Sequence, residues 1–265
     1  MNDLPKLLDR IVAPDGAAGL QAQWALDRLT KPAGSLGRLE ELARRLSEMS
    51  GQFPPQARRC VIFTLAADHG VVAEGVSAYP QIVTAQMVEN FLQGGAAVNV
   101  LARHVGAHVV VADLGVASPL PAHPGIVSRR IGPGTRNMAK GPAMTREEAL
   151  AAIEVGIGLV YAERGNGLDV IGTGEMGIGN TTAASAVVAA LTGAPAASVT
   201  GTGTGVDDEG RLRKIAVIKR ALAVNRADSG DGVDVLAKVG GFEIAGLCGV
   251  ILAGAAWRIP VILDG

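Results

Sequence analysis

The alternation of short apolar runs with longer helical stretches constrains this chain most. A continuous apolar run occupies residues 60–67, and similar runs occupy 107–114 and 168–171. Runs of this length without alternating polar residues predict strands that are buried on both faces. Longer stretches with helical spacing separate them. Strands that alternate with helices predict an α/β fold with a doubly wound, mostly parallel, Rossmann-like sheet.

The other elements follow from their boundary signals. Thr145 and Glu148 fit a capping box, in which each residue's side chain bonds the other's backbone N–H, and this box opens a helix that runs to Arg164. The glycine- and arginine-rich segment 118–144 is expected to be a loop. The remaining helices are expected over 80–104, with Gly94-Gly95 as a weak point, 181–191 and 208–225, and the remaining strands over 196–200 and 259–263.

The first fifty residues form a different kind of segment. They look helical and polar-faced, and Gly51–Pro55 is a plausible boundary. We expect residues 1–52 to be the helical part of a small domain and residues 53–265 to be a Rossmann-like nucleotide-binding domain. Residues 244–263 are long enough to span a bilayer, but Arg258 and Pro260 favour a small-residue helix followed by a strand.

Charge and composition exclude several partners. The net charge is −1, and the two Tyr, two Trp and four Phe offer little for base stacking, so we expect no nucleic-acid binding. We also expect no membrane partner. Cys60 and Cys248 lie in apolar runs and are expected to be buried free thiols in a reducing cytosol. The first residues lack the apolar stretch of a secretory signal.

The strongest local motif is the glycine-rich turn GTGEMGIGNTT at residues 172–182, which follows a strand and opens a helix. Its backbone N–H groups and the positive end of the helix dipole suit a phosphate. The glycine spacing also fits the dinucleotide fingerprint, but residues 189–195 hold no carboxylate to bind a ribose. The Gly-Lys-Ser/Thr of a P-loop is absent. A mononucleotide phosphate site is therefore favoured, and the alternative is a tight turn that binds nothing.

A carboxylate and a second turn complete this candidate site. Glu175 lies inside the first turn, where it would repel an anion, so we interpret it as a contact for sugar hydroxyls or a cationic ring. A second glycine-rich turn, 200–205, is expected to follow a strand and precede a helix. That helix carries Arg211, Arg213 and Lys214 near its start, where cations oppose the helix dipole unless one meets an anion. The alternative is a solvated basic face.

Two further groups of residues carry weaker signals. Asp68 and His69 end the first apolar run and suggest a metal, but the remaining histidines do not complete a ligand set, so we favour a structural role and expect no metal. Ser77, Tyr79 and Gln86 are consistent with ordinary loop and helix-cap chemistry.

Eight segments together carry a resemblance to a known family. They run in order from Thr30 to Gly265 and read TKPAGSLGRLEELA, AADHGV, EGVSAYPQIVTAQM, GPGTRNMAKGPAMT, TGEMGIGNTTAAS, GTGTGVDD, GGFEIAGLCGVILAGAA and PVILDG. In these segments the chain resembles the nicotinate-nucleotide:dimethylbenzimidazole phosphoribosyltransferases of cobalamin assembly.

The resemblance implies transfer of the phosphoribosyl group of nicotinate mononucleotide to 5,6-dimethylbenzimidazole, giving α-ribazole 5′-phosphate and nicotinate. It also implies a cytoplasmic homodimer with no metal and no cofactor. By position it assigns a catalytic role near the ribose to Glu175. It assigns the benzimidazole pocket to Ser77, Tyr79 and Gln86. It assigns nucleotide binding to Gly174, Gly177, Gly179, Asn180, Thr181, Gly203, Thr204 and Lys214.

At its end the sequence differs from the family pattern. Family members continue past PVILDG and bring a glutamate there as general base, whereas this sequence stops at Gly265. We therefore expect a C-terminally truncated transferase. The alternative is a fragment or remnant that binds the nucleotide without turning it over.

Overall fold

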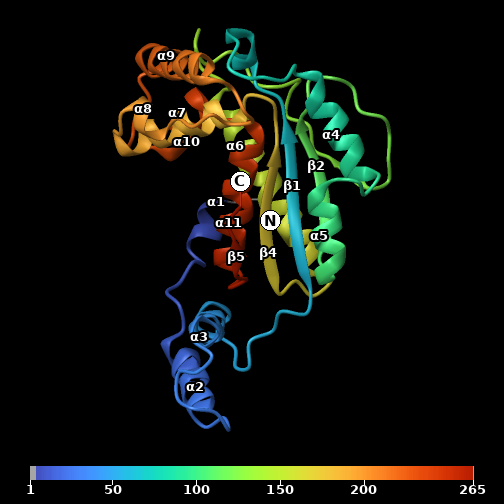
Figure 1. The fold of residues 1–265 in the computed structure, drawn as a ribbon, viewed down its shortest axis with the longest axis vertical. Coiled ribbons are helices and arrows are strands. Elements are labelled where there is room, and N and C mark those ends of the chain that lie inside the picture. Colours follow the sequence, from blue (N-terminus) through green and yellow to red (C-terminus); the bar gives the residue numbers. More distant parts are fainter. Residues whose placement is uncertain (1–3, 265) are drawn as a thin grey trace.

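The computed structural model describes residues 4–264 and is built on a five-stranded parallel sheet (Figure 1). Its strands are β1 (Cys60–Ala67), β2 (His108–Gly115), β3 (Ile126–Ser128), β4 (Val170–Met176) and β5 (Val261–Ile262). Their order is β3-β2-β1-β4-β5, so the winding direction reverses between β1 and β4. The expected doubly wound parallel sheet is confirmed. Sheets of this kind bind ligands beyond the carboxyl ends of the strands at such a reversal.

The register brings three strands to the same edge. Leu65 on β1 pairs with Ala112 on β2 and with Glu175 on β4. The segments that follow these strands therefore leave the sheet side by side. Consecutive side chains of β1 point to opposite faces of the sheet. Phe63 and Leu65 belong to one core cluster, and Ala66 belongs to another. This burial on both faces explains the continuous apolar run.

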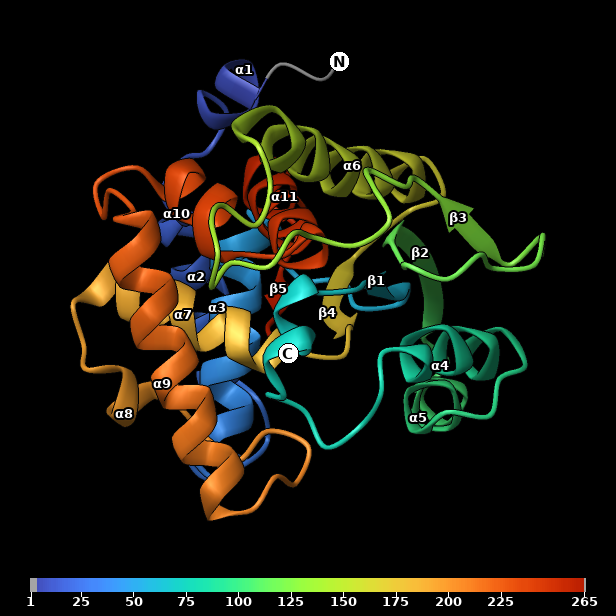
Figure 2. The ribbon, with the colours of Figure 1, turned by 90° about the horizontal axis from the view of Figure 1, so that it is seen from above.

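Helices cover both faces of the sheet (Figure 2). α6 (Arg146–Arg164) and α11 (Phe242–Ala256) pack together on one face, and α4 (Ile82–Leu92) and α5 (Ala97–Val105) lie on the other. The capping box of Thr145 and Glu148 is present at the start of α6, as predicted. Helix 80–104 divides into α4 and α5 at Gly94, which has a φ of 75° that favours glycine.

A second helical cluster continues from β4. It contains α7 (Asn180–Thr192), α8 (Ala196–Val199), α9 (Asp208–Asn225) and α10 (Gly232–Val239), which share a core of small and branched side chains. The predicted strand at 196–200 is wrong, because this segment forms α8. Pro195 precedes the helix, and the hydroxyls of Ser198 and Thr200 donate to carbonyls three and four residues earlier. The second glycine turn therefore follows a helix rather than a strand.

Three elements were not expected. β3 lies within the segment 118–144, which the sequence indicates as a loop. α10 lies in a segment for which the sequence predicts neither a helix nor a strand. A 3-10 helix, η1 (Gly70–Glu74), follows β1. Cys60 and Cys248 are free thiols as expected, but both are partly exposed rather than buried.

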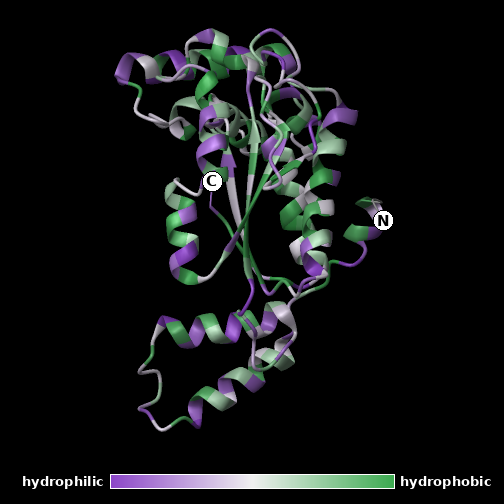
Figure 3. Ribbon diagram, turned by 90° about the vertical axis from the view of Figure 1, so that its right-hand side faces the viewer, coloured by the Kyte–Doolittle hydropathy of each residue, from purple (hydrophilic) through white to green (hydrophobic). Residues whose placement is uncertain are grey.

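The N-terminal segment contributes α1 (Leu4–Leu8), α2 (Gly16–Asp27) and α3 (Arg38–Ser50). α2 and α3 pair as a hairpin at the amino ends of the strands, opposite the edge described above (Figures 1 and 3). Leu7 of α1 instead joins the core cluster of α6 and α11. No helix within residues 4–264 has the length and apolar character needed to cross a membrane.

A candidate nucleotide site at the sheet edge

Glu175, near the end of β4, lines three cavities that converge on it. The turn cavity, of about 160 Å³, is bounded by Ser77, by residues 175–181 and by Lys214. The sheet cavity, of about 630 Å³, lies between the sheet and α4–α5 and is lined mostly by apolar side chains, including Met87 and Phe91. The helix cavity, of about 310 Å³, is bounded by α7 and α11. One carboxyl group therefore faces all three spaces.

The turn that follows β4 approaches other backbone so closely that only glycine fits. A Cβ on Gly177 would lie 2.1 Å from the carbonyl oxygen of Ala67, and Gly179 has a φ of 94° at the N-cap of α7. The N–H of Ile178 donates to Thr84 Oγ1 at 3.0 Å. The N–H groups of Gly177, Gly179 and Thr181 have no acceptor within residues 4–264. Three donors at a helix N-terminus are thus left for an anion.

Lys214 brings a buried cation to the same cavity from α9. It is 2% exposed, and its Nζ donates to Thr181 Oγ1 at 2.8 Å. Burial lowers the pKa of Lys214, and the ammonium has no ion pair with any carboxylate in the described part of the chain. A Cβ on Gly203 would lie 2.8 Å from this Nζ, so the second glycine turn passes directly over it. A bound anion would compensate the buried charge.

Glu175 has an unusual charge balance. Its pKa is raised to about 7, first by burial and then by the Glu243 carboxylate, while His69 opposes the rise and Asp264 adds to it. Its Oε2 accepts a hydrogen bond from the side-chain amide of Asn180. A carboxyl group that titrates near neutrality can hold or release a proton during a reaction.

A buried polar network supports the turn from beneath. His69 Nε2 lies 2.7 Å from Glu243 Oε1, and both side chains are almost fully buried. Thr84 donates to Asp68 Oδ1 at 2.6 Å, and Asp68 Oδ2 accepts the Ala117 N–H at 2.8 Å. Burial raises the pKa of Asp68, and the hydrogen bonds from Thr84 and Ala117 oppose that rise. The sequence indicated a structural role for Asp68 and His69 but not the partner Glu243, which is 174 positions from His69.

The structure separates the other sequence candidates. Lys214 faces the turn cavity, whereas Arg211 donates to backbone carbonyls at 197 and 200 and Arg213 pairs with Glu209. The turn cavity is also lined by Gly177, Gly179, Asn180, Thr181 and Thr204. Gly174 lines the sheet cavity. No cluster of three or more His, Cys, Asp or Glu suited to a metal occurs among residues 4–264.

The three residues assigned to the benzimidazole pocket lie in different settings. Ser77 lines the turn cavity, and its Oγ accepts the Tyr79 N–H at 3.1 Å. The Tyr79 side chain is 50% exposed. Gln86 is exposed on α4, one residue before Met87 of the sheet cavity.

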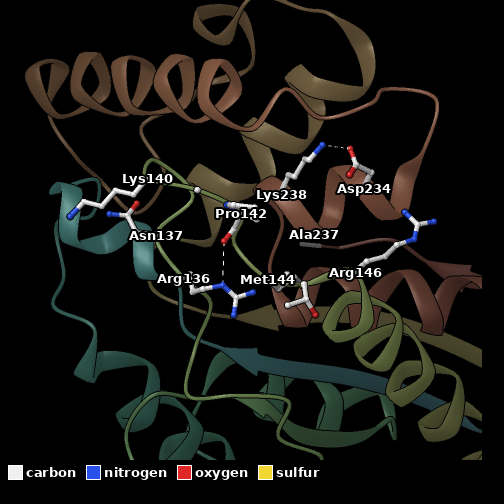
Figure 4. Close-up of a pocket in the computed structure, with 11 residues that line it drawn as sticks. Arg136, Asn137, Lys140, Pro142, Met144, Arg146, Asp234, Ala237 and Lys238 are labelled. Carbon is white, nitrogen blue, oxygen red and sulfur yellow. Dashed lines mark hydrogen bonds and ion pairs between the residues drawn. The ribbon is translucent and has the colours of Figure 1, made fainter.

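A separate basic hollow of about 600 Å³ lies between the 136–146 segment and α10 (Figure 4). Three of its four cations are paired with carboxylates, and the fourth, Lys140, is exposed to solvent. Arg136 pairs with Glu148, Arg146 with Asp231 and Lys238 with Asp234, at 2.6 to 2.8 Å. It therefore lacks the unpaired buried charge that distinguishes the turn cavity.

Comparisons with known proteins agree with this arrangement. A family model described as "Phosphoribosyltransferase" matches residues 11–265. Proteins named nicotinate-nucleotide–dimethylbenzimidazole phosphoribosyltransferase from Geobacter metallireducens and a Roseiflexus species are each 56% identical over the whole chain, which spans 75% of their length. The crystal structure of CobT from Thermus thermophilus is 48% identical, with a TM-score of 0.89 over 94% of this chain and 74% of that one. The chain therefore belongs to the nicotinate-nucleotide–dimethylbenzimidazole phosphoribosyltransferase family.

Proposed function

We propose that this chain transfers the phosphoribosyl group of nicotinate mononucleotide to 5,6-dimethylbenzimidazole, giving α-ribazole 5′-phosphate and nicotinate. The observation that carries the proposal is the position of Glu175. It faces an anion-binding turn cavity on one side and a large apolar cavity on the other. Family membership and the names of the relatives support the same reaction.

The turn cavity suits the nucleotide's phosphate. The N–H groups of Gly177, Gly179 and Thr181 are available to donate, and Lys214 supplies the positive charge. The second turn, with Gly203 and Thr204, completes the wall above Lys214. A phosphate held in this way would place the ribose toward Glu175, because Glu175 lies in β4 two residues before Gly177 of that turn.

The reaction makes modest demands at the leaving group. In nicotinate mononucleotide the glycosidic nitrogen belongs to a pyridinium, so breaking the C1′–N bond returns that electron pair to the ring. Nicotinate leaves with an uncharged ring nitrogen and needs no general acid. A benzimidazole nitrogen then forms the new bond to C1′ from the opposite face, which converts the β configuration to α.

The positive charge that develops on the ribose and the proton of the incoming base both call for a carboxylate. An oxocarbenium-like transition state is stabilised by a nearby negative charge. The benzimidazole N–H must also lose its proton to a base. We propose that Glu175, with a pKa of about 7, supplies the negative charge near the ribose and accepts the benzimidazole proton as the new C1′–N bond forms.

The aromatic acceptor requires an apolar surface. The sheet cavity provides one through Met87 and Phe91 on α4, the helix that also carries Gln86. Ser77 lines the turn cavity together with Glu175, and its hydroxyl accepts the backbone N–H of Tyr79. We propose that these elements form the benzimidazole side of the site. We further propose a cytoplasmic homodimer, as the resemblance implies.

Calorimetry and a product assay test the proposal together. Purified chain is titrated with nicotinate mononucleotide and then incubated with both substrates, and α-ribazole 5′-phosphate is measured by chromatography. Binding with product formation is the expected result. Binding without product would favour the nucleotide-binding alternative, and absence of binding would overturn the site assignment. Sedimentation in the same buffer tests the dimer.

A further inference from the structure

Beneath the anion-binding turn lies a buried ion pair that the reaction above does not use. His69 follows β1, and Glu243 lies in the first turn of α11. Their side chains are 1% and 0% exposed and are joined by the 2.7 Å contact. Two ionisable groups held this far from water are costly unless each compensates the other. The cost of burying this pair indicates that it has a function in the protein.

The imidazole is in contact with the turn itself. A Cβ on Gly177 would lie 3.3 Å from His69 Cδ2 and Nε2, and one on Gly179 would lie 3.4 Å from His69 Cβ. On its other side, a Cβ on Gly241 would lie 2.4 Å from His69 Cε1. The ring is thus packed between the turn and the start of α11.

The pair also acts on Glu175 through space. Glu243 raises the pKa of Glu175, and His69 lowers it. Asp264 is the other charged group that acts on Glu175, while Asp68 and Glu175 act on His69 together with Glu243. Burial lowers the pKa of His69, but these three carboxylates raise it by more, so the pKa of His69 lies above its ordinary value. Glu243 Oε2 has no hydrogen-bond partner within residues 4–264.

We propose that His69 and Glu243 are positioning residues, which hold the Gly177–Gly179 turn against the sheet and set the charge with which Glu175 meets the nucleotide. The inference rests on the proposed function, because it assumes that the nucleotide lies beside Glu175. Neither residue touches the substrate. Their effect reaches it through the turn and through Glu175.

The test follows the affinity for nicotinate mononucleotide as a function of pH in the 265-residue chain. The pyridinium and ribose favour an ionised Glu175, so affinity in the wild type should rise with pH through a midpoint near 7. Glu243→Gln removes the neighbouring negative charge, and the midpoint should fall by about one pH unit. Glu175→Gln should remove this midpoint. Glu163→Gln, which removes a carboxylate paired with Arg59 far from the turn, should leave it at the wild-type value.

The outcomes separate the two proposals. A wild-type chain that does not bind the mononucleotide at any pH contradicts the proposed function. Binding with the same midpoint in wild type and Glu243→Gln contradicts the positioning role alone. A purely structural role would weaken binding at every pH and leave the midpoint unmoved.

Two further measurements test the proposal if the Glu243→Gln variant does not fold. In the double variant His69→Gln/Glu243→Gln, two amides replace the buried ions, and the midpoint should again lie below that of the wild type. Nitrogen-15 NMR of the wild-type imidazole needs no substitution. Followed over pH, it should give His69 a pKa above its ordinary value, and a lowered pKa would overturn the proposal.

Discussion

Gly156 on α6 and Gly246 on α11 meet backbone to backbone. A Cβ on Gly156 would lie 1.9 Å from the carbonyl oxygen of Gly246, well inside any tolerable contact. One turn further along α11, a Cβ on Gly249 would lie 2.0 Å from the carbonyl oxygen of Ile153. The absence of side chains at this crossing lets α11 lie close to α6 and so fixes where α11, and Glu243 at its start, sits over the sheet.

This crossing predicts opposite effects for two glycines on one helix. Gly156→Ala should destabilise the fold by about 3 kcal/mol, because the helices must separate to admit the methyl group. Gly158 has nothing within 4 Å of its would-be Cβ, so Gly158→Ala should stabilise it by about 0.5–1 kcal/mol through helix propensity. Urea unfolding of both variants measures the difference. Equal effects would show that the helices do not cross at Gly156.

The raised pKa of Glu175 predicts a stability effect with a defined sign. The folded state holds the Glu175 proton more tightly than the unfolded state, so stability is fully present below pH 4.5 and is lost as pH rises to about 7. Glu175→Gln mimics the protonated form. It should therefore stabilise the fold above pH 7 by about 2 kcal/mol, a figure reduced from the full pKa shift because the group is partly exposed.

Denaturant titrations at pH 4.5 and pH 8.5 test that effect. The gain should appear only at the higher pH. Glu209→Gln is the matched control, because Glu209 is exposed and pairs with Arg213 on the surface. An equal gain at both pH values would show that Glu175 does not titrate as described. In a chain that turns over both substrates, Glu175→Gln should also lower the rate about a hundredfold.

Lys214 should dominate phosphate binding. Lys214→Met removes the buried cation and should weaken binding of nicotinate mononucleotide by about 30- to 150-fold, equivalent to about 2–3 kcal/mol. It should also raise the stability of the free chain, because burial opposes the charge at this position. Lys219→Gln, on the exposed side of the same helix, should change neither. Calorimetry gives the affinities, and unchanged binding in Lys214→Met would place the phosphate elsewhere.

The capping box at Thr145 should matter to the fold alone. Thr145 Oγ1 accepts the Glu148 N–H at 3.1 Å, and Glu148 Oε2 accepts the Thr145 N–H at 2.7 Å. Thr145→Ala should cost about 1 kcal/mol in urea unfolding. Affinity for nicotinate mononucleotide should stay at the wild-type value, and a large loss of affinity would mean that α6 is coupled to the turn cavity.

Local patterns predicted the parts of the fold that depend on neighbours in sequence. A strand buried on both faces gives an unbroken apolar run in the sequence, so the bounds of β1 and β2 were predicted to within one residue. The stretch 196–200 is too short to distinguish strand from helix. Pro195 and the hydroxyls of Ser198 and Thr200 favour the helix α8. β3 has three residues and depends on pairing with β2, which no local signal reveals.

In the candidate site, too, the features set by neighbours in sequence were predicted, and those set by tertiary packing were not. The sequence predicts a turn over 172–182 because glycine, a strand end and a helix start are contiguous there, but β4 extends through Met176 and α7 begins at Asn180, so the turn itself is shorter than predicted. The selection of Lys214 over Arg211 and Arg213 needed the packing of α9, which turns only that cation inward. The pairing of His69 with Glu243 depends on α11 reaching β1 from a distant part of the chain. Only the tertiary structure brings the two side chains together.

The turn, sheet and helix cavities all meet at the Glu175 carboxyl group, and this has a consequence for how two ligands can bind. Small molecules that occupy different cavities become neighbours instead of competitors. A bimolecular exchange needs this geometry, because both partners must be present at once with their reacting atoms close together. The shared wall at Glu175 is where such a pair would meet.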